Sequence, residues 1–253
     1  MTKDNTPYEQ AFYNDRHQQT LYAAERLIEG IEHVLPPVRS AVDIGCGVGT
    51  WLSVFKNRGV ERIQGYEGPW VDESLLAIPT DSFEKRDLTQ VIPAPGEKFD
   101  IAMSLEVAEH LPPESAATFV ESLTNLSDFV LFSAAIPNQG GRHHVNEQWI
   151  EYWLELFEAK GYTGLDVLRR RLWNDERIQP WYRQNAILLA KRDRLDELTL
   201  PDSPDALQPL SLVHPRSLED RVAAYEREKA KMQSLSGSWK LFRRAMRRAA
   251  SGH

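Results

Sequence analysis

A glycine-rich turn between a predicted strand and a predicted helix constrains the fold of this chain most strongly. The turn lies in the stretch VDIGCGVGTW, where residues 40–45 form an apolar run and residues 48–59 have helical periodicity. Glycine lets the backbone turn sharply and approach a ligand closely. The free N–H groups at the start of the following helix can then face that ligand. The alternating glycines are Gly45, Gly47 and Gly49.

Predicted strands and helices alternate along most of the chain. Further strands are expected over residues 62–67, 82–87, 98–106, 128–135, 165–173 and 185–191, and further helices over residues 8–35, 113–127 and 146–162. This alternation predicts an α/β fold with a mostly parallel sheet and helices on both faces. The segment 174–184 is too short and irregular for a crossover helix, so the last strand is expected to be antiparallel.

Acidic and polar residues recur where the predicted strands end. Glu67 could accept hydrogen bonds from both hydroxyls of a ribose, and Asp87 could accept one from an adenine amino group. Asp43 could bind an amino group or order the glycine turn. Open α/β sheets bind ligands at the carboxyl ends of their strands. A dinucleotide is the alternative ligand, but its usual spacing is G-x-G-x-x-G and the spacing here is G-x-G-x-G.

Four motifs, VDIGCGVGTW, GYE, RDL and FDIAMSLEVAEHL, resemble in this order the class I S-adenosylmethionine-dependent methyltransferases. The resemblance covers residues 40–191 and implies a Rossmann-like sheet of seven strands with an antiparallel last strand. It also implies that S-adenosylmethionine is the cofactor. The residues expected to bind it are Asp43, Gly45, Cys46, Gly47, Gly49, Trp51, Glu67, Gly68, Asp87, Leu88, Ser104 and Leu105.

The motif EVAEH predicts a cation site. If a helical turn follows the fourth strand, Glu106, Glu109 and His110 lie on one face, and their carboxylates would favour Mg²⁺ or Mn²⁺. The same residues bind metal in small-RNA 2′-O-methyltransferases and ubiquinone-pathway O-methyltransferases, to which the motif is similar. The alternative is that this stretch binds no metal and that His110 packs against neighbouring side chains or caps the helical turn.

The segment GGRHHVNEQW after the fifth predicted strand is expected to hold the acceptor chemistry. It is similar to a G-G-x-x-H-x-N-E-Q-W pattern in bacterial methyltransferases, many of which act in the biosynthesis of surface glycans or polysaccharides, including a mycobacterial methylmannose-polysaccharide type. His144 matches the patterned histidine and is expected to be a general base or a fourth metal ligand, while His143 is a bystander. The expected substrate-binding residues are Tyr13, Arg16, Asn146, Glu147, Gln148, Trp181 and Tyr182.

Some of these positions have simpler structural explanations. Asn146 and Glu147 could merely cap the helix that follows them. The spacing of Trp149 and Trp153 favours buried positions on one apolar face of that helix. Trp181 and Tyr182 precede the final strand in a segment broken by a proline, where they could stack on a sugar or cover the site.

Four segments are expected along the chain: an N-terminal helical lid (1–38), a cofactor-binding domain (39–192), a proline-rich linker (193–215) and a charged tail (216–253). The end of the tail carries five lysines and arginines and no acid, although the whole chain has a net charge of −7. An amphipathic pattern over residues 238–250 favours either an anionic membrane surface or docking on the chain's own domain or a partner subunit, as in a homodimer. The acidic remainder disfavours nucleic acid as a partner.

The sequence therefore predicts a methyltransferase that acts on a hydroxyl of a sugar, oligosaccharide or polysaccharide. The single cysteine, the lack of a signal-peptide core and the lack of a long apolar run favour the cytoplasm, with the tail at the inner membrane surface. One alternative is an O-methyltransferase of small molecules such as quinones or natural products. The other is a non-catalytic, cofactor-binding scaffold.

Overall fold

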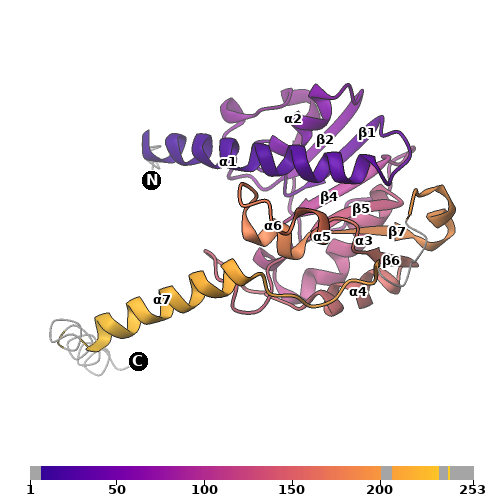
Figure 1. Cartoon of the computed structure of the whole chain (residues 1–253). Helices are drawn as coiled ribbons and strands as arrows, with labels where there is room; N and C mark the ends of the chain where they lie inside the picture. The colour runs from indigo at the N-terminus through magenta and orange to yellow at the C-terminus, as the bar shows by residue number, and fades with distance from the viewer. Residues whose placement is uncertain (1–6, 201–206, 234–238, 240–253) are drawn as a thin grey trace. The chain divides into compact units, whose positions relative to one another are not determined.

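The computed structural model describes residues 7–200, 207–233 and 239, and for residues 7–19 it describes the backbone alone. The chain divides into two compact units, Met1–Leu212 and Val213–His253. The first unit is an α/β unit, and the second contains helix α7 (Pro215–Gln233) (Figure 1). Among the described residues, no helix combines the length and apolar character that a membrane span requires.

A seven-stranded sheet forms the centre of the first unit, with strand order β3-β2-β1-β4-β5-β7-β6. Strand β7 is antiparallel to both of its neighbours, and the other neighbouring pairs are parallel. The predicted α/β fold with an antiparallel last strand is thus confirmed. The strands are β1 (Ser40–Ile44), β2 (Arg62–Glu67), β3 (Phe83–Lys85), β4 (Ile101–Leu105), β5 (Phe129–Ser133), β6 (Tyr162–Leu165) and β7 (Ile187–Lys191).

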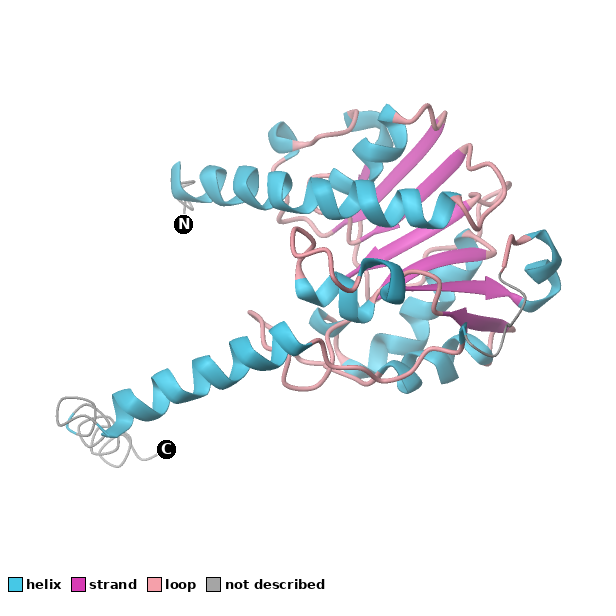
Figure 2. Ribbon diagram, viewed as in Figure 1, coloured by secondary structure: helices cyan, strands magenta, loops and turns pink. Residues whose placement is uncertain are grey.

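Helices cover both faces of the sheet (Figure 2). Successive strand residues alternate between two apolar clusters, so that Leu131 packs in the cluster with α1 and α2 while Phe132 packs in the cluster with α3 and α4. The helices of the first unit are α1 (Pro7–Glu32), α2 (Thr50–Asn57), α3 (Ala116–Leu126), α4 (Ile150–Glu158), α5 (Arg169–Leu172) and α6 (Pro180–Asn185). Short 3₁₀ turns occupy η1 (Glu73–Leu75), η2 (Thr80–Ser82), η3 (Ala108–His110), η4 (Pro113–Ser115) and η5 (Arg192–Glu197).

The prediction for residues 165–173 is wrong, because the strand there ends at Leu165 and α5 follows it. Leu165, Leu168 and Leu172 are all buried and are spaced three and four residues apart, which is a helical period. The following segment, expected to be irregular, contains α6, which begins with Pro180 in its first turn.

Helix α4 begins later than the sequence predicts. Its first residue is Ile150, so Asn146 does not cap it. Trp153 is buried in the core as expected, but Trp149 precedes the helix and is 42% exposed, so the prediction of a core position for Trp149 is wrong. The delayed start leaves residues 134–149 as a long connection between β5 and α4.

Part of the segment expected to be a linker hydrogen-bonds to the first unit. Asp166 N–H donates to the Leu207 carbonyl at 2.6 Å, and the buried Arg169 guanidinium donates to the Leu210 carbonyl at 2.8 Å. The Ser211 hydroxyl donates to the Glu151 carboxylate. Residues 207–212 therefore lie against the sheet domain.

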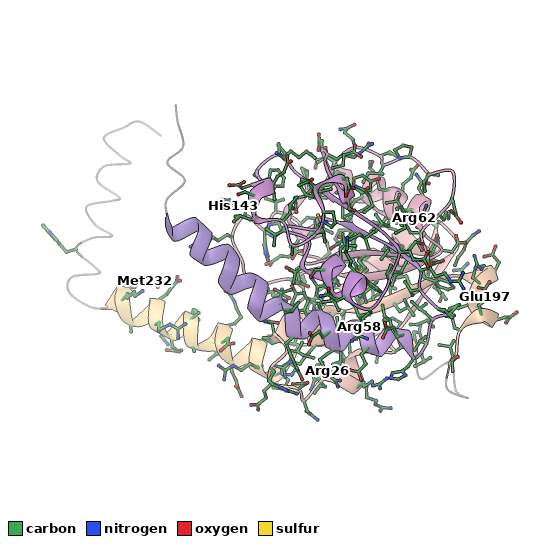
Figure 3. All side chains as sticks on the ribbon, turned by 90° about the horizontal axis from the view of Figure 1, so that it is seen from above. Arg26, Arg58, Arg62, His143, Glu197 and Met232 are labelled. Carbon is green, nitrogen blue, oxygen red and sulfur yellow. The ribbon has the colours of Figure 1, made fainter. Side chains whose placement is uncertain are left out.

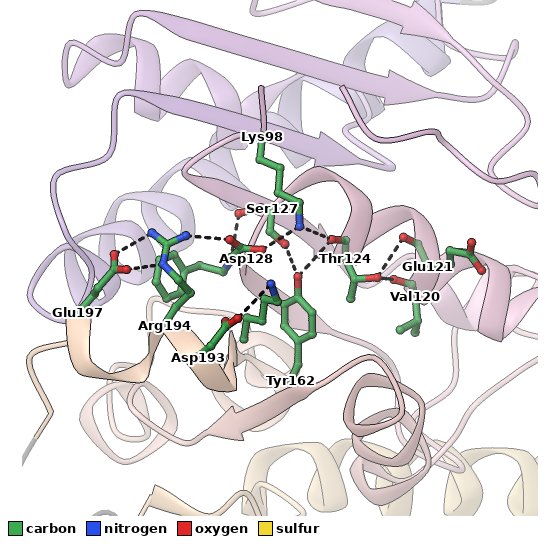
Figure 4. Close-up of polar contacts among 12 residues, drawn as sticks. Lys98, Val120, Glu121, Thr124, Ser127, Asp128, Tyr162, Asp193, Arg194 and Glu197 are labelled. Atoms are coloured by element: carbon green, nitrogen blue, oxygen red, sulfur yellow. Dashed lines mark hydrogen bonds and ion pairs between the residues drawn. The ribbon is translucent and has the colours of Figure 1, made fainter. Parts of the chain in front are cut away.

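A polar cluster fastens the amino-terminal edge of the sheet (Figure 4). Asp128, just before β5, accepts hydrogen bonds from Lys98 and Arg194, each at 2.8 Å. The buried Tyr162 hydroxyl lies at 2.6 Å from the Ser127 carbonyl and 3.1 Å from the Thr124 carbonyl. These contacts join β5, β6 and the segment after β7 at the edge opposite the glycine turn.

Replacing Tyr162 with phenylalanine leaves two buried carbonyls without their hydroxyl partner. We expect the free energy of unfolding to fall by about 1–3 kcal/mol. The matched control is Tyr152→Phe, because Tyr152 is half-buried and packs edge-to-face on Trp153. Urea unfolding measures both variants, and an equal loss in the two would contradict the assigned role of the Tyr162 hydroxyl.

Candidate functional site

A cavity of about 660 Å³ lies at the carboxyl ends of β1, β2 and β4. The glycine turn forms one wall, and η3 and the connection 134–149 form another. This is the edge at which open α/β sheets bind ligands. Of the expected cofactor-binding residues, the lining includes Asp43, Gly45, Cys46, Gly47, Trp51, Glu67 and Leu105.

The glycine turn has a left-handed backbone, with φ of 83° at Gly45. A Cβ atom at Gly45 would lie 2.4 Å from the Val107 side chain, so both the conformation and the space require glycine there. The turn therefore brings the backbone between β1 and α2 against the residues after β4.

Glu67 holds the glycine turn from the end of β2. Its carboxylate accepts hydrogen bonds from Gly47 N–H at 2.9 Å and Gly68 N–H at 2.8 Å. Burial raises the pKa of Glu67, and these N–H donors together with Trp70 offset part of that rise. A carboxylate in this position can exchange a backbone donor for the hydroxyls of a ligand.

Asp43 lies beside Glu67 at the end of β1 and is 2% exposed. Burial and then the charge of Glu67 raise the pKa of Asp43 well above 3.8. Its Oδ2 has no hydrogen-bond partner among the described residues. A ligand cation, such as an ammonium group, would satisfy this carboxylate.

Five expected cofactor residues do not line the cavity: Gly49, Gly68, Asp87, Leu88 and Ser104. Asp87 is exposed and accepts hydrogen bonds from the N–H and the hydroxyl of Thr89, which lower its pKa. Those contacts form a local turn after β3. A Cβ atom at Gly49 would meet Ile78 and one at Gly68 would meet Trp70, while Ser104 is fully buried.

The long connection after β5 is fixed by one carboxylate. Glu147 accepts hydrogen bonds from Asn138 N–H at 2.8 Å and Gly140 N–H at 3.0 Å. The same carboxylate lies 2.8 Å from Nδ1 of His144. Glu147, expected from the sequence to bind substrate, is thus engaged within the connection and orients the His144 ring.

The second glycine of GGRHH makes room for that ring. A Cβ atom at Gly141 would lie 2.0 Å from Nε2 of His144. The imidazole therefore packs directly on the Gly141 backbone, and it does not line the cavity. Its edge faces η3, where the ring of His110 meets it edge-to-face with centroids 4.7 Å apart.

Three side chains in this region could hold a metal ion. Glu109, His110 and His144 each offer one ligand atom, and these atoms lie within 4.8 Å of one another. Glu109 is 1% exposed, and neither of its carboxylate oxygens makes a well-formed hydrogen bond to a described residue. Burial and the charge of Glu106 raise the pKa of Glu109 to about 9, and nearby backbone N–H groups offset only part of the rise. A cation would satisfy this buried carboxylate.

Glu106 lies outside this cluster of ligand atoms, although the sequence groups it with them. Its two carboxylate oxygens accept hydrogen bonds from Gln139 Nε2 at 2.7 Å and Asn185 Nδ2 at 3.0 Å. Its backbone has a φ of 57°, a conformation that side chains rarely adopt. Glu106 therefore joins β4, the connection after β5, and α6 in one buried polar network.

Nine cavity-lining residues were not among the expected site residues, and Trp70, Arg142 and His143 are three of them. Trp70 is 68% exposed although it follows Glu67 by only three residues. His143 has a left-handed φ of 63° and is exposed, and Figure 3 labels it on the side of the unit opposite Glu197. The sequence position of Trp70, just after a strand end at the binding edge, could have identified it as a site residue. Which of the adjacent residues His143 and His144 faces the cavity depends on the loop conformation, which the sequence does not reveal.

The remaining expected substrate residues fall into three groups. Trp181 and Tyr182 line the cavity, where Tyr182 packs edge-to-face on Trp51. Asn146 is 2% exposed, and its N–H and that of Val145 donate to the Glu109 carbonyl, while the Gln148 side chain donates to Asn146. The side chains of Tyr13 and Arg16 lie outside the described part of the chain, as does the tail 238–250 except for Trp239.

The sequence model of the methyltransferase domain matches residues 15–174, which is more than half of the chain. The chain belongs to this methyltransferase family. Comparison with curated proteins gives no significant match.

Solved structures show the same fold. A SAM-dependent methyltransferase from Archaeoglobus fulgidus has a TM-score of 0.50 and 17% identity, over 74% of this chain and 100% of that chain. An O-methyltransferase family protein from Burkholderia thailandensis has a TM-score of 0.52 and 12% identity, over 75% of this chain and 60% of that chain. The plantazolicin methyltransferase BpumL has a TM-score of 0.50 and 13% identity, over 75% of this chain and 91% of that chain. The fold is therefore that of the S-adenosylmethionine-dependent methyltransferases.

Replacing Asp43 with asparagine removes a buried carboxyl whose pKa is raised well above 3.8. The folded wild type retains a proton that the unfolded chain releases, so wild-type stability falls as pH rises above that value. We expect Asp43→Asn to unfold at a higher temperature by a few degrees, where about 1 kcal/mol corresponds to about 2–4 °C. The difference should increase as the pH rises above about 5, towards the raised pKa of Asp43.

Thermal unfolding without ligand measures this effect. Asp87→Asn is the control, because a lowered pKa gives a stability contribution that is already complete at these pH values. If the difference in unfolding temperature between Asp43→Asn and the wild type does not grow with pH, the raised pKa of Asp43 is contradicted.

Proposed function

We propose that this protein transfers a methyl group from S-adenosylmethionine to a hydroxyl group of a sugar unit. The observation that carries the proposal is the composition of the cavity lining. There, exposed Trp70 and Trp181 lie on the same cavity as the polar side chains of His110, Arg142 and His143. Aromatic faces pack on the C–H faces of sugar rings, and polar groups bind their hydroxyls.

In the proposed complex, the cofactor lies between the glycine turn and the end of β4. Asp43 would take the ammonium group of the methionine part, and Glu67 would take the ribose hydroxyls in place of Gly47 N–H. The methyl group would then face η3 and the connection after β5. The support is that Asp43, Glu67 and the turn line one cavity with His143.

The reaction forms a bond between the acceptor oxygen and the methyl carbon and breaks the bond between that carbon and the sulfonium sulfur. The electron pair of the broken bond stays on sulfur, and the hydroxyl proton goes to a base. A hydroxyl is a weak nucleophile, so a positioned base accelerates the step. His143 is the proposed base, because its ring is on the cavity whereas His144 is packed beneath Gly141.

We also propose that Glu109, His110 and His144 hold a divalent cation. The buried carboxylate, which makes no well-formed hydrogen bond to a described residue, and the two close imidazoles fit such an ion. One carboxylate with two imidazoles suits Mn²⁺, Co²⁺ or Zn²⁺ better than Mg²⁺, and Glu106 is already bound by two amides. A bound cation supplies Lewis-acid chemistry that stabilises negative charge on a nearby oxygen. Glu147 would orient His144 through Nδ1.

A second candidate is methyl transfer to a planar aromatic small molecule. The exposed Trp70 and Trp181 rings that fit a sugar could also stack on such an acceptor. Product analysis separates the two candidates.

We expect methylated products when the protein is incubated with isotopically labelled S-adenosylmethionine and a panel of oligosaccharides. Mass spectrometry would detect the labelled methyl group, and the same incubation with phenols and quinols tests the second candidate. Trp181→Ala should lower kcat/KM by about tenfold or more by removing a stacking surface. Labelled phenols without labelled sugars would overturn the sugar assignment.

Neighbouring histidines should have separable roles. His144→Ala and Glu109→Gln are expected to abolish Mn²⁺ binding measured by calorimetry, whereas His143→Ala should bind Mn²⁺ as the wild type does. His143→Ala should instead lower kcat by about 10²–10⁴-fold, the usual contribution of a general base.

His33→Ala, an exposed position after α1, is the control for both measurements. Wild-type Mn²⁺ affinity in His144→Ala would refute the cation site. Full activity of the His143→Ala variant would show that another group is the base.

A further inference from the structure

Helix α7 of the second unit carries an exposed apolar stripe with the spacing of a coiled-coil seam. Leu218, Val222, Tyr225, Lys229 and Met232 follow one another at intervals of four, three, four and three residues. The apolar members are 57%, 53%, 62% and 50% exposed in chain order. A helix repeats every 3.6 residues, so this alternation keeps all five positions on one face.

The described ion pairs along the helix contribute little to its stability. These pairs are local, between Arg216 and Asp220 at 3.3 Å and between Glu226 and Lys229 at 3.6 Å, and both are exposed. Exposed pairs of this kind contribute only about 0.3–0.5 kcal/mol each. Isolated helices of fewer than about 12–15 residues are marginally stable in water. Longer helices in proteins gain most of their stability from the packing of an apolar face. Burial of the apolar stripe would therefore stabilise α7 more than these ion pairs do.

We propose that α7 pairs with α7 of a second copy of this chain as a parallel, two-stranded coiled coil. In heptad terms, Leu218, Tyr225 and Met232 occupy d positions, and Val222 and Lys229 occupy a positions. The inference is independent of the proposed acceptor and cation, because α7 belongs to a different unit from the cavity.

Charges beside the stripe favour a second copy in the parallel orientation. Arg221 is at a g position, and in a parallel pair it meets the e position five residues later, Glu226 of the second copy. By symmetry, Glu226 of the first copy meets Arg221 of the second copy on the opposite side of the seam. In an antiparallel pair, e positions face e positions and g positions face g positions, so the attraction of Arg221 for Glu228 is opposed by repulsion between Glu219 and Glu226. The flanking charges therefore favour helices that run in the same direction.

Lys229 in the stripe limits the strength of the pair and selects its form. A single polar residue at an a position specifies register and oligomer state at a cost in stability. The described helix spans fewer than three heptads, and exposed Trp239 follows Met232 by one further heptad interval. We therefore expect a weak dimer, with a dissociation constant on the order of 10 µM.

Sedimentation equilibrium of the full chain from about 1 µM to about 100 µM tests the proposal. The wild type should pass from monomer to dimer, and Val222→Glu should remain monomeric. Ala223→Glu adds the same charge at the adjacent exposed position outside the stripe and should dimerise as the wild type does. Lys229→Leu should tighten the dimer at least tenfold, and this gain cannot result from misfolding.

Two charge exchanges test the orientation. Arg221→Glu and Glu226→Arg should each weaken the dimer, and the double variant Arg221→Glu/Glu226→Arg should restore it. A wild type that stays monomeric throughout, or a dimer indifferent to Val222→Glu and Lys229→Leu, would overturn the proposal. Failure of the double variant to recover would overturn the parallel register.

Discussion

Parallel pairing of β1 with β2 on one side and β4 on the other determines where the other functional elements lie. The register sets Asp43 opposite Gly65 and Met103, so the three strands end at the same edge of the sheet. The turn after β1, Glu67 at the end of β2 and Glu106 after β4 consequently surround one cavity. Because both faces of the sheet are covered by helices, this edge is where polar groups can collect without disrupting the core.

The connection after β5 is the second element that shapes the site. It contains few regular hydrogen bonds of its own, and instead its backbone is bound by Glu147 and by the Glu109 carbonyl. The ring of His144 is thereby packed between Gly141 and His110. This arrangement leaves His143 on the cavity and directs His144 to the buried Glu109. The two adjacent histidines thus face different environments and are suited to different chemistry.

The sequence predicted the sheet, its antiparallel strand and the residues of the glycine turn, because these follow from apolar runs and from backbone geometry that only glycine allows. The prediction failed over residues 165–172, where the leucine spacing was interpreted as one strand. Leu165 ends strand β6, and the leucines after it follow the helical period of α5. The prediction also failed where loop conformation decides, since neither the φ of His143 nor the packing of His144 under Gly141 can be inferred from spacing. Trp149 was misplaced because the start of α4 depends on the tertiary contacts of the connection before it.

In the proposed complex, one cavity holds the cofactor with its methyl group toward the connection after β5. A crystal structure with S-adenosylhomocysteine, the demethylated product, tests this most directly. We expect the ribose hydroxyls on the Glu67 carboxylate, the amino group near Asp43, and the sulfur facing the His143 side of the cavity. Density for the product elsewhere, or a sulfur turned away from residues 140–144, would contradict it.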